Sequence, residues 1–262
     1  MPYVIIPNRY RMAQDAFMQT STRRRFPPPP FDARALILRA HPNPESFNSG
    51  LAEAYADAAA AAGLTVETVD TDALDFDLRL RHGHAKDQAL EPALRQLMQQ
   101  VEEAAHIVVA SPVWWGSVPA SFKGLIDRLF LPGWAFRSGT SAFPERGLRG
   151  RTARVLLTMD APGWWDRFIY GKSASRQLEK AWLEFVGMKS LGVERFTAIE
   201  KTDAKARQAM LDRAARLGAR DAAKARSALA RLGREGDVEV RQVGAAHGVV
   251  DENVAGLGQG RA

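Results

Sequence analysis

The sequence predicts an α/β protein, a three-layer sandwich in which a five-stranded parallel sheet lies between two layers of helices. Five short strand-like runs alternate with segments that have helical spacing. The third run is apolar throughout, as strands are when helices cover both faces of a sheet. Polar or aromatic loops follow runs one, three and four, and ligands bind at the carboxyl ends of such strands. The expected strands are residues 35–38, 65–70, 106–110, 151–159 and 190–198.

The first strand leads into a polar turn. Two prolines in His41-Pro42-Asn43-Pro44 exclude a helix there, and an alanine-rich helix is expected from Gly50 to Ala62. The start of a helix carries unpaired N–H groups and a partial positive charge, which attract phosphate. Ser46 and Asn48 therefore have two interpretations, as caps of this helix or as donors to a bound phosphate.

The connection after the second strand, residues 71–88, is long and polar. It contains His82 and His84, but no cysteine or third ligand accompanies them, so we expect no metal. A helix is expected over residues 89–104, where leucines and a valine recur at three- and four-residue spacing.

Large aromatic residues follow the third strand. The segment Ser111–Phe130 passes through two tryptophans and Gly116 into a helix that starts near Pro119. Trp114 and Trp115 either cap the core or support a flat ring whose edge reaches the backbone amides. Adjacent side chains of an extended loop cannot both point inward, so at least one ring is expected to face a ligand or partner.

The rest of the chain continues the alternation of strands and helices. We expect an excursion rich in glycine and proline, a loop after the fourth strand, two further helices and the fifth strand. Asp203 is expected to cap the last helix, which reaches at least Leu217. These segments are residues 131–150, the loop 160–170, the helix 175–186 and an exposed helix extending over 207–232.

The composition predicts one folded domain with two arms. The 262 residues are 46% hydrophobic and 25% charged. We expect an N-terminal extension over 1–31 with a polyproline spacer and an edge strand at Tyr3–Ile6. The folded domain is expected over 32–232 and a poorly ordered tail over 233–262. Neither arm has a core pattern, so deletion of 1–30 and 240–262 is expected to preserve folding.

The positive charge is concentrated in residues 1–31 and 199–262. Residues 1–31 carry a net charge of +4, residues 199–262 carry +3, and the segment between them carries −1. A nucleic-acid partner is therefore not expected, because such proteins place basic residues along a folded face. The absence of cysteine excludes disulfides, a thiolate nucleophile and iron–sulfur sites.

The chain has no apolar run of about 20 residues and no secretory signal, so we expect no membrane-spanning segment and a cytoplasmic location. It also has neither GxGxxG nor GxxxxGKS after the first strand, which argues against a Rossmann dinucleotide site and a P-loop.

Three motifs together resemble the flavodoxin-fold NAD(P)H:quinone oxidoreductases over residues 33–198. They are AHPNPESFN at 40–48, PVWWGSVPASFKGLIDR at 112–128 and LPGWAF at 131–136. The resemblance implies a flavodoxin-like fold, a homodimer, bound FAD (FMN in some relatives), NADH or NADPH as hydride donor and a small-molecule quinone-like acceptor. It also implies that His41, Ser46, Phe47 and Asn48 hold the phosphates, and that Pro112, Val113, Trp114, Trp115 and Gly116 line the isoalloxazine.

The loop after the fourth strand departs from this family. A Thr-Thr-Gly-Gly type sequence is replaced by Met159-Asp160-Ala161-Pro162-Gly163, and Pro162 has no N–H to donate. Asp160, Ala161 and Gly163 are still assigned to the cofactor site. We expect Asp160 to turn away from the flavin and accept hydrogen bonds from the amides of Gly163 and Trp164.

The resemblance assigns no catalytic side chain, because the flavin carries the chemistry. Trp115 and Tyr170 are expected to line the substrate site. Two alternatives remain open: another acceptor, such as a nitroaromatic, an azo compound or free flavin, and a flavin-binding regulatory subunit of a membrane protein. A single-electron carrier is disfavoured, because such carriers present acidic docking faces and residues 32–198 are nearly neutral.

Overall fold

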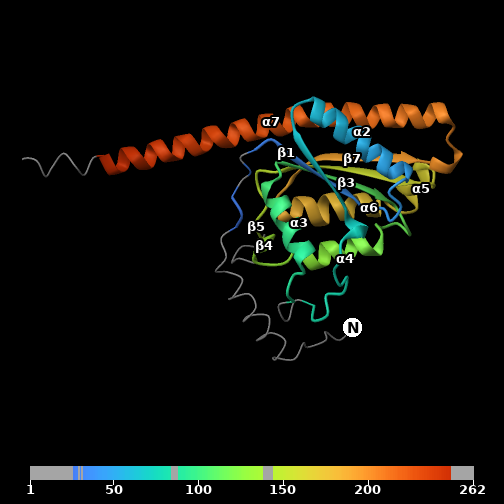
Figure 1. Ribbon diagram of the computed structural model, residues 1–262, viewed down its shortest axis with the longest axis horizontal. Coiled ribbons are helices and arrows are strands. Elements are labelled where there is room, and N and C mark those ends of the chain that lie inside the picture. The colour runs from blue at the N-terminus through green and yellow to red at the C-terminus, as the bar shows by residue number, and fades with distance from the viewer. Residues whose placement is uncertain (1–25, 29, 31, 84–87, 138–143, 249–262) are drawn as a thin grey trace, which may run out of the picture.

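The computed structural model describes residues 26–28, 30, 32–83, 88–137 and 144–248, with side chains described as far as residue 232. Its centre is a five-stranded sheet in the order β2-β1-β3-β6-β7 (Figure 1). All four strand pairings are parallel. The predicted α/β fold with a five-stranded parallel sheet is confirmed. The strands are β1 (Arg34–Arg39), β2 (Thr65–Asp70), β3 (His106–Pro112), β6 (Thr152–Met159) and β7 (Lys189–Thr197).

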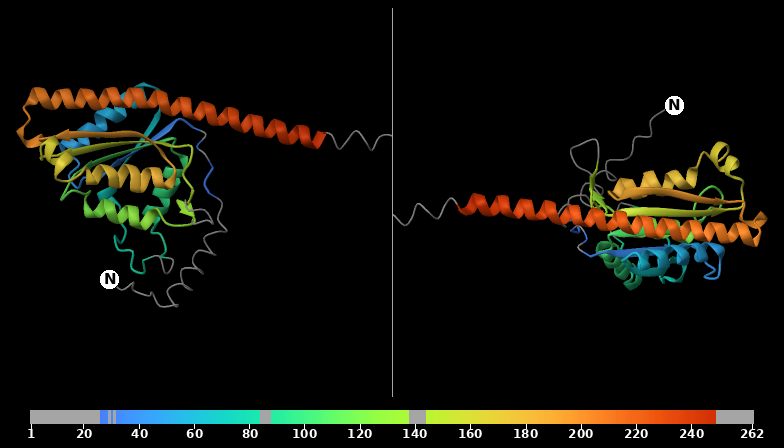
Figure 2. Two further views of the ribbon diagram at one scale, coloured as in Figure 1. Left: turned by 180° about the vertical axis from the view of Figure 1, so that it is seen from behind. Right: turned by 90° about the horizontal axis from the view of Figure 1, so that it is seen from above.

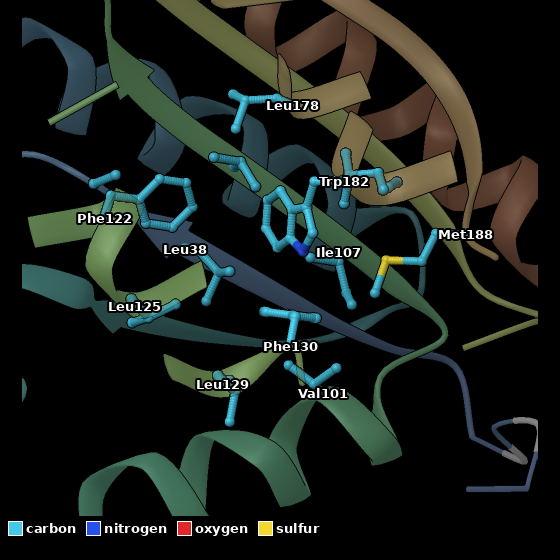
Figure 3. Packing of buried hydrophobic residues seen from close by; sticks show 14 of the residues in the cluster. Leu38, Val101, Ile107, Phe122, Leu125, Leu129, Phe130, Leu178, Trp182 and Met188 are labelled. Atoms are coloured by element: carbon cyan, nitrogen blue, oxygen red, sulfur yellow. The ribbon is translucent and has the colours of Figure 1, made fainter. Parts of the chain in front are cut away.

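Helices cover both faces of the sheet, as the apolar third strand indicates. On one face, alternate residues of β1, β3 and β6 pack against α2 (Phe47–Ala61) and α7 (Ala204–Gly248). On the other face they pack against α3 (Pro92–Glu103), α4 (Ala120–Leu129) and a later helical segment. Figure 3 shows Phe122 and Leu125 of α4 beside Trp182 and Leu38 in this second core.

The first helix begins three residues earlier than expected, at Phe47 instead of Gly50. Ser46 has an extended backbone conformation, and its Oγ accepts a hydrogen bond from the amide of Ser49 at 3.2 Å. This is the geometry of an N-cap, which satisfies one of the free amides of the first turn. Phe47 and Asn48 are consequently part of the helix and not of the turn before it.

Two predictions after β6 need correction. The segment 160–170 is not only a loop, because it contains the short helix α5 (Gly163–Phe168). The helix expected over 175–186 begins at α6 (Ser173–Arg176) and continues as a π-helix, η2 (Gln177–Glu184). The remaining short elements are the pair β4 (Phe136–Arg137) and β5 (Glu145–Arg146), and two 3-10 turns, η1 (Thr71–Ala73) and η3 (Ile199–Lys201).

Helix α7 is longer than the sequence indicates. Asp203 caps it as expected, since its Oδ1 accepts a hydrogen bond from the amide of Ala206 at 2.7 Å. The helix packs along α2 and then projects beyond the sheet (Figures 1 and 2). The irregular tail expected from residue 233 is therefore wrong for 233–248, and 249–262 lie outside the described residues. No helix in the described part of the chain is both long and apolar enough to cross a bilayer.

A buried polar network joins α7 to the amino-terminal end of the sheet. The Asp221 carboxylate accepts hydrogen bonds from Arg154 Nε and Nη2 at 2.5 and 2.9 Å. It also accepts one from the Tyr55 hydroxyl at 3.0 Å, and this hydroxyl lies 2.8 Å from His106 Nε2. All four side chains are buried. Burial lowers the pKa of His106 to about 4, so the imidazole is neutral at pH 7.

The end of the N-terminal extension packs on the domain. The Phe26 ring lies 4.1 Å from the Arg137 guanidinium, and the Pro28 carbonyl accepts a hydrogen bond from Arg151 Nη2 at 3.0 Å. Pro30 is buried. Burial also lowers the pKa of Arg151, to about 10. Among the described residues, Phe26 and Pro28 of the expected extension therefore contact the domain. The edge strand expected at Tyr3–Ile6 lies outside the described residues.

Candidate functional site

Three loops meet at the carboxyl edge of the sheet, after β1, β3 and β6. The parallel pairing of these strands places their ends side by side. The ring of His41 lies 5.9 Å from that of Trp114 in an edge-on arrangement, which joins the first loop to the second. The Val113 amide donates to the Thr158 carbonyl at 2.8 Å, which joins the second loop to the end of β6.

The first loop closes on itself before α2. His41 Nδ1 lies 3.0 Å from the Asn43 amide nitrogen, and Asn43 Oδ1 accepts a hydrogen bond from the Glu45 amide at 2.9 Å. Because Ser46 accepts from Ser49, its side chain acts as a helix cap. The amides of Phe47 and Asn48 have no partner among the described residues, as the first turn of a helix requires.

Asn48 is the most informative polar residue at this edge. It is only 2% exposed, and its Nδ2 donates to Thr158 Oγ1 at 3.2 Å. Its Oδ1 is buried and has no hydrogen-bond partner among the described residues. A buried acceptor without a donor costs free energy, so this oxygen marks a place for a ligand hydroxyl or amide. Asn48 is therefore more than a second cap of α2.

The loop after β3 is a tight turn with Trp115 at its tip. The backbone groups of Trp114 and Ser117 exchange two hydrogen bonds of 2.9 Å, and both central residues have positive φ, 52° at Trp115 and 72° at Gly116. Glycine adopts this conformation freely, whereas a tryptophan in it is strained by about 1–2 kcal/mol. Pro112 ends β3 and is buried.

Both tryptophans of this turn point away from the core. Trp114 is 44% exposed and Trp115 is 99% exposed. The amides of Trp115 and Gly116 have no acceptor among the described residues. Both rings are therefore accessible, as a ring that faces a ligand or partner must be, and the prediction of such a contact stays a prediction.

The third loop continues into α5 and surrounds the same turn. The Tyr170 ring lies beside Gly116, where an added Cβ would come within 3.8 Å of it, and the Ser173 hydroxyl donates to the Gly116 carbonyl. Trp165 stacks edge-on against Tyr170 at 6.4 Å. The amides of Gly163 and Trp164 start α5 and have no acceptor among the described residues.

Asp160 does not form the expected turn. Its Oδ1 accepts a hydrogen bond from the Glu200 amide at 3.1 Å, so the carboxylate ties the end of β6 to the segment after β7. The amides expected to bind it, those of Gly163 and Trp164, stay free. The prediction that Asp160 bonds a backbone amide is correct, but the partner is wrong, because Gly163 and Trp164 begin α5 and the carboxylate bonds the Glu200 amide instead.

The structure thus brings most of the predicted residues together at one edge. His41, Asn48, Trp114, Trp115, Gly116, Gly163 and Tyr170 lie around the three loops, whereas Ser46 is used as a cap. Phe47 is partly covered by the Arg207 guanidinium, 5.6 Å from its ring. Ala161 is half-buried in the third loop.

Three residues that hold the site together were missed. Thr158 bonds Asn48 and the Val113 amide, Ser173 bonds Gly116, and Glu200 bonds Asp160. The sequence carries no local signal for them, because each acts on a residue more than 35 positions away. In the described part of the chain no cluster of three or more His, Asp or Glu is arranged to hold a metal.

The residues at this edge fit a flavin. The unpaired helix-start amides suit a phosphate, the orphaned Asn48 oxygen suits a hydroxyl, and the exposed tryptophans with their free amides suit the ring. The fold is therefore that of a flavodoxin-type α/β protein, and the loops at its carboxyl edge form the candidate site. Residues 33–218 match Flavodoxin_2, described as a flavodoxin-like fold, and the chain belongs to this family.

Similar proteins of known sequence are named as redox enzymes. The chain is 29% identical over 146 residues to a ribosyldihydronicotinamide dehydrogenase [quinone] of Mus musculus, covering 48% of this chain and 62% of that one. It is 26% identical over 190 residues to an uncharacterized NAD(P)H oxidoreductase of Haemophilus influenzae, covering 69% and 91%. The chain thus spans less than two thirds of the length of the first of these relatives.

Solved structures show the same fold. Smu.1420 from Streptococcus mutans UA159 is 27% identical with a TM-score of 0.60, and the match covers 71% of this chain and 99% of that chain. The NAD(P)H:quinone oxidoreductase from Methanothermobacter marburgensis is 24% identical with a TM-score of 0.62, covering 72% and 98%. At 24% identity the second likeness concerns the fold alone.

Proposed function

We propose that the protein is a flavin-dependent oxidoreductase that passes a hydride from NADH or NADPH through bound flavin to a small quinone-like acceptor. The observation that carries the proposal is the buried Asn48 Oδ1, unpaired among the described residues, in the first turn of α2, where the Asn48 amide group bonds Thr158 at the carboxyl end of β6. The names of the similar proteins support the same chemistry. The bound flavin supplies the hydride relay, so no protein nucleophile is required.

The chain's own residues bind and orient. In this proposal the amides of Phe47 and Asn48 hold a phosphate, and Asn48 Oδ1 accepts a hydrogen bond from a hydroxyl of the cofactor. The amides of Trp115 and Gly116 address the polar edge of the ring. Trp115 and Tyr170 line the place where donor and acceptor bind in turn, and their rings exclude water from it.

FAD is the proposed cofactor, with FMN as the alternative. A structural neighbour, an FMN-dependent NADH-azoreductase from Bacillus anthracis in complex with FMN, has a TM-score of 0.56 and 17% identity. We also propose a cytoplasmic homodimer, in which a second copy of the chain covers the exposed aromatic side chains of α5. Phe168 and Trp164 on α5 are 72% and 58% exposed.

The test is the absorption spectrum of the purified full-length protein. We expect a flavin band that NADH or NADPH bleaches and that a soluble quinone restores under anaerobic conditions. Restoration by an azo dye or a nitroaromatic, but not by quinone, identifies the acceptor as that alternative. Flavin that no nicotinamide reduces supports the regulatory-subunit alternative. Protein that neither retains nor takes up flavin refutes the proposal. Chromatography of the released flavin distinguishes FAD from FMN.

Two neighbouring variants separate binding from capping. Asn48→Ala removes the orphaned acceptor and is expected to weaken flavin retention by about 1–3 kcal/mol, roughly 5- to 150-fold. Ser46→Ala removes only the cap and is expected to lower the free energy of unfolding by about 1 kcal/mol with little change in flavin affinity. Equal flavin retention by both variants contradicts the assignment of Asn48.

A further inference from the structure

A second candidate ligand site lies at the opposite end of the sheet. An open surface cavity of about 530 Å³ lies between the starts of β6 and β7 and the middle of α7, and its basic side chains are exposed. Thr152 and Lys189, the first residues of their strands, line it. Each strand then runs roughly 25 Å to the carboxyl edge, at about 3.3 Å per residue. One small molecule at the flavin edge therefore does not reach this cavity.

Three basic side chains line this cavity from two elements. Lys189 comes from β7, and Lys224 and Arg231 come from α7, where their spacing of seven residues places them on one face. None of its lining residues is acidic. The nearby carboxylates of α7 and β7 pair elsewhere, Asp221 with Arg154 and Glu194 with Arg213. Among the described residues, the three cations form no ion pair.

The rest of the lining is apolar or already bonded. Leu191, Ala223 and Ala228 supply apolar surface. The Ser190 hydroxyl donates to Glu179 Oε1 at 2.8 Å, and the Ser227 hydroxyl donates to the Ala223 carbonyl at 2.9 Å. Among the described side chains that line this cavity, the polar groups without a bonded partner are therefore the cations, beside an apolar surface. Its volume lies within the range of small-molecule sites.

We propose that this cavity binds an organic phosphate of nucleotide size. Lys189, Lys224 and Arg231 hold the phosphate groups, and the apolar side chains contact the organic part. Three cations from two elements suit more than one phosphate oxygen, and arginine adds a bidentate contact. A ligand here bridges α7 to the strands at the point where the helix leaves the domain (Figure 2). The site is independent of the proposed redox function.

The test is isothermal titration of flavin-saturated, full-length protein with ADP and, separately, with pyrophosphate at matched ionic strength. We expect ADP to bind with one equivalent at this cavity and pyrophosphate to bind more weakly, because it lacks the organic part. The combined variant Lys189→Gln, Lys224→Gln and Arg231→Gln is expected to weaken ADP binding by at least about tenfold. The control variant removes three exposed cations elsewhere, Lys201, Lys205 and Arg216, each changed to Gln.

The control loses the same charge, so its ADP affinity is expected to change less than about twofold. Circular dichroism and flavin content establish that both variants are folded. An equal loss in both variants means general charge attraction and overturns the proposal. So does unchanged ADP binding in the cavity variant, which places ADP at the nicotinamide site or another surface. Failure of both probes to bind the parent protein also refutes it.

Discussion

Replacing Asp221 with Asn tests how α7 is held to the sheet. The carboxylate is 0% exposed and accepts two hydrogen bonds from Arg154 and one from Tyr55. The Arg154 side chain is 4% exposed, so its charge stays buried when the carboxylate is lost. Breaking a buried pair by removing one partner costs about 3–5 kcal/mol. Because Asn keeps one acceptor oxygen, we expect a loss near 3 kcal/mol.

The assay is urea unfolding followed by tryptophan fluorescence and circular dichroism, with the slope against urea compared between variants. Asp212→Asn is the matched control, because Asp212 is on the same helix and is exposed. We expect it to change the free energy of unfolding by less than about 0.5 kcal/mol. Replacing both partners with apolar residues, Arg154→Met and Asp221→Leu, is expected to recover most of the loss. A cost below about 1 kcal/mol for Asp221→Asn refutes the reasoning.

Three further predictions concern pH and the two ends of the domain. The folded pKa of His106, about 4, lies below the usual 6.5, so the unfolded chain binds more protons between these values. The free energy of unfolding should therefore fall by roughly 3 kcal/mol from pH 6.5 to 4, and His106→Gln should flatten this slope in urea titrations. Deletion of residues 1–25 should leave the melting temperature unchanged. Deletion of 1–30 should lower it, because the buried Arg151 guanidinium loses the Pro28 carbonyl as an acceptor. Equal melting temperatures of the two deletion variants would contradict a stabilising contact of residues 26–30 with the domain. Asp160→Asn keeps the acceptor for the Glu200 amide and should leave the flavin midpoint potential unchanged; a large positive shift would place the carboxylate against the ring.

The strands could be predicted because their patterns are local. The alternating run Thr65–Asp70 matches β2 residue for residue, and the apolar third run matches the start of β3. The start of α2 was placed too late because Asn48 and Ser49 are weak helix formers. Helix α5 was missed because Gly163, two tryptophans and an aspartate are poor helix formers too. The helix forms nevertheless, and in the first turn of α5 the Pro162 carbonyl accepts a hydrogen bond from the Trp165 amide.

Hydrogen bonds between residues that are far apart in the sequence could not be predicted. Asn48 and Thr158 are 110 positions apart, and they meet only because β1 and β6 both flank β3. The sequence favoured two uses of Asn48 equally, since nothing near it tells a cap from a ligand contact. The same limit explains the wrong partner for Asp160, because Glu200 reaches it only through the pairing of β6 with β7.

The two ends of the sheet differ in how completely their polar groups are satisfied. At the amino-terminal end, Tyr55, His106, Arg154 and Asp221 bond one another and are sealed from solvent. At the carboxyl edge, several backbone amides and the Asn48 Oδ1 have no partner in the part of the chain that the structure describes. Satisfied buried polar groups stabilise a fold, whereas unsatisfied groups at a loop cluster cost stability unless a ligand pairs them. Changes at Asp221 should therefore lower stability without altering the flavin affinity of the folded protein, and bound flavin should raise the melting temperature of every variant that keeps Asn48.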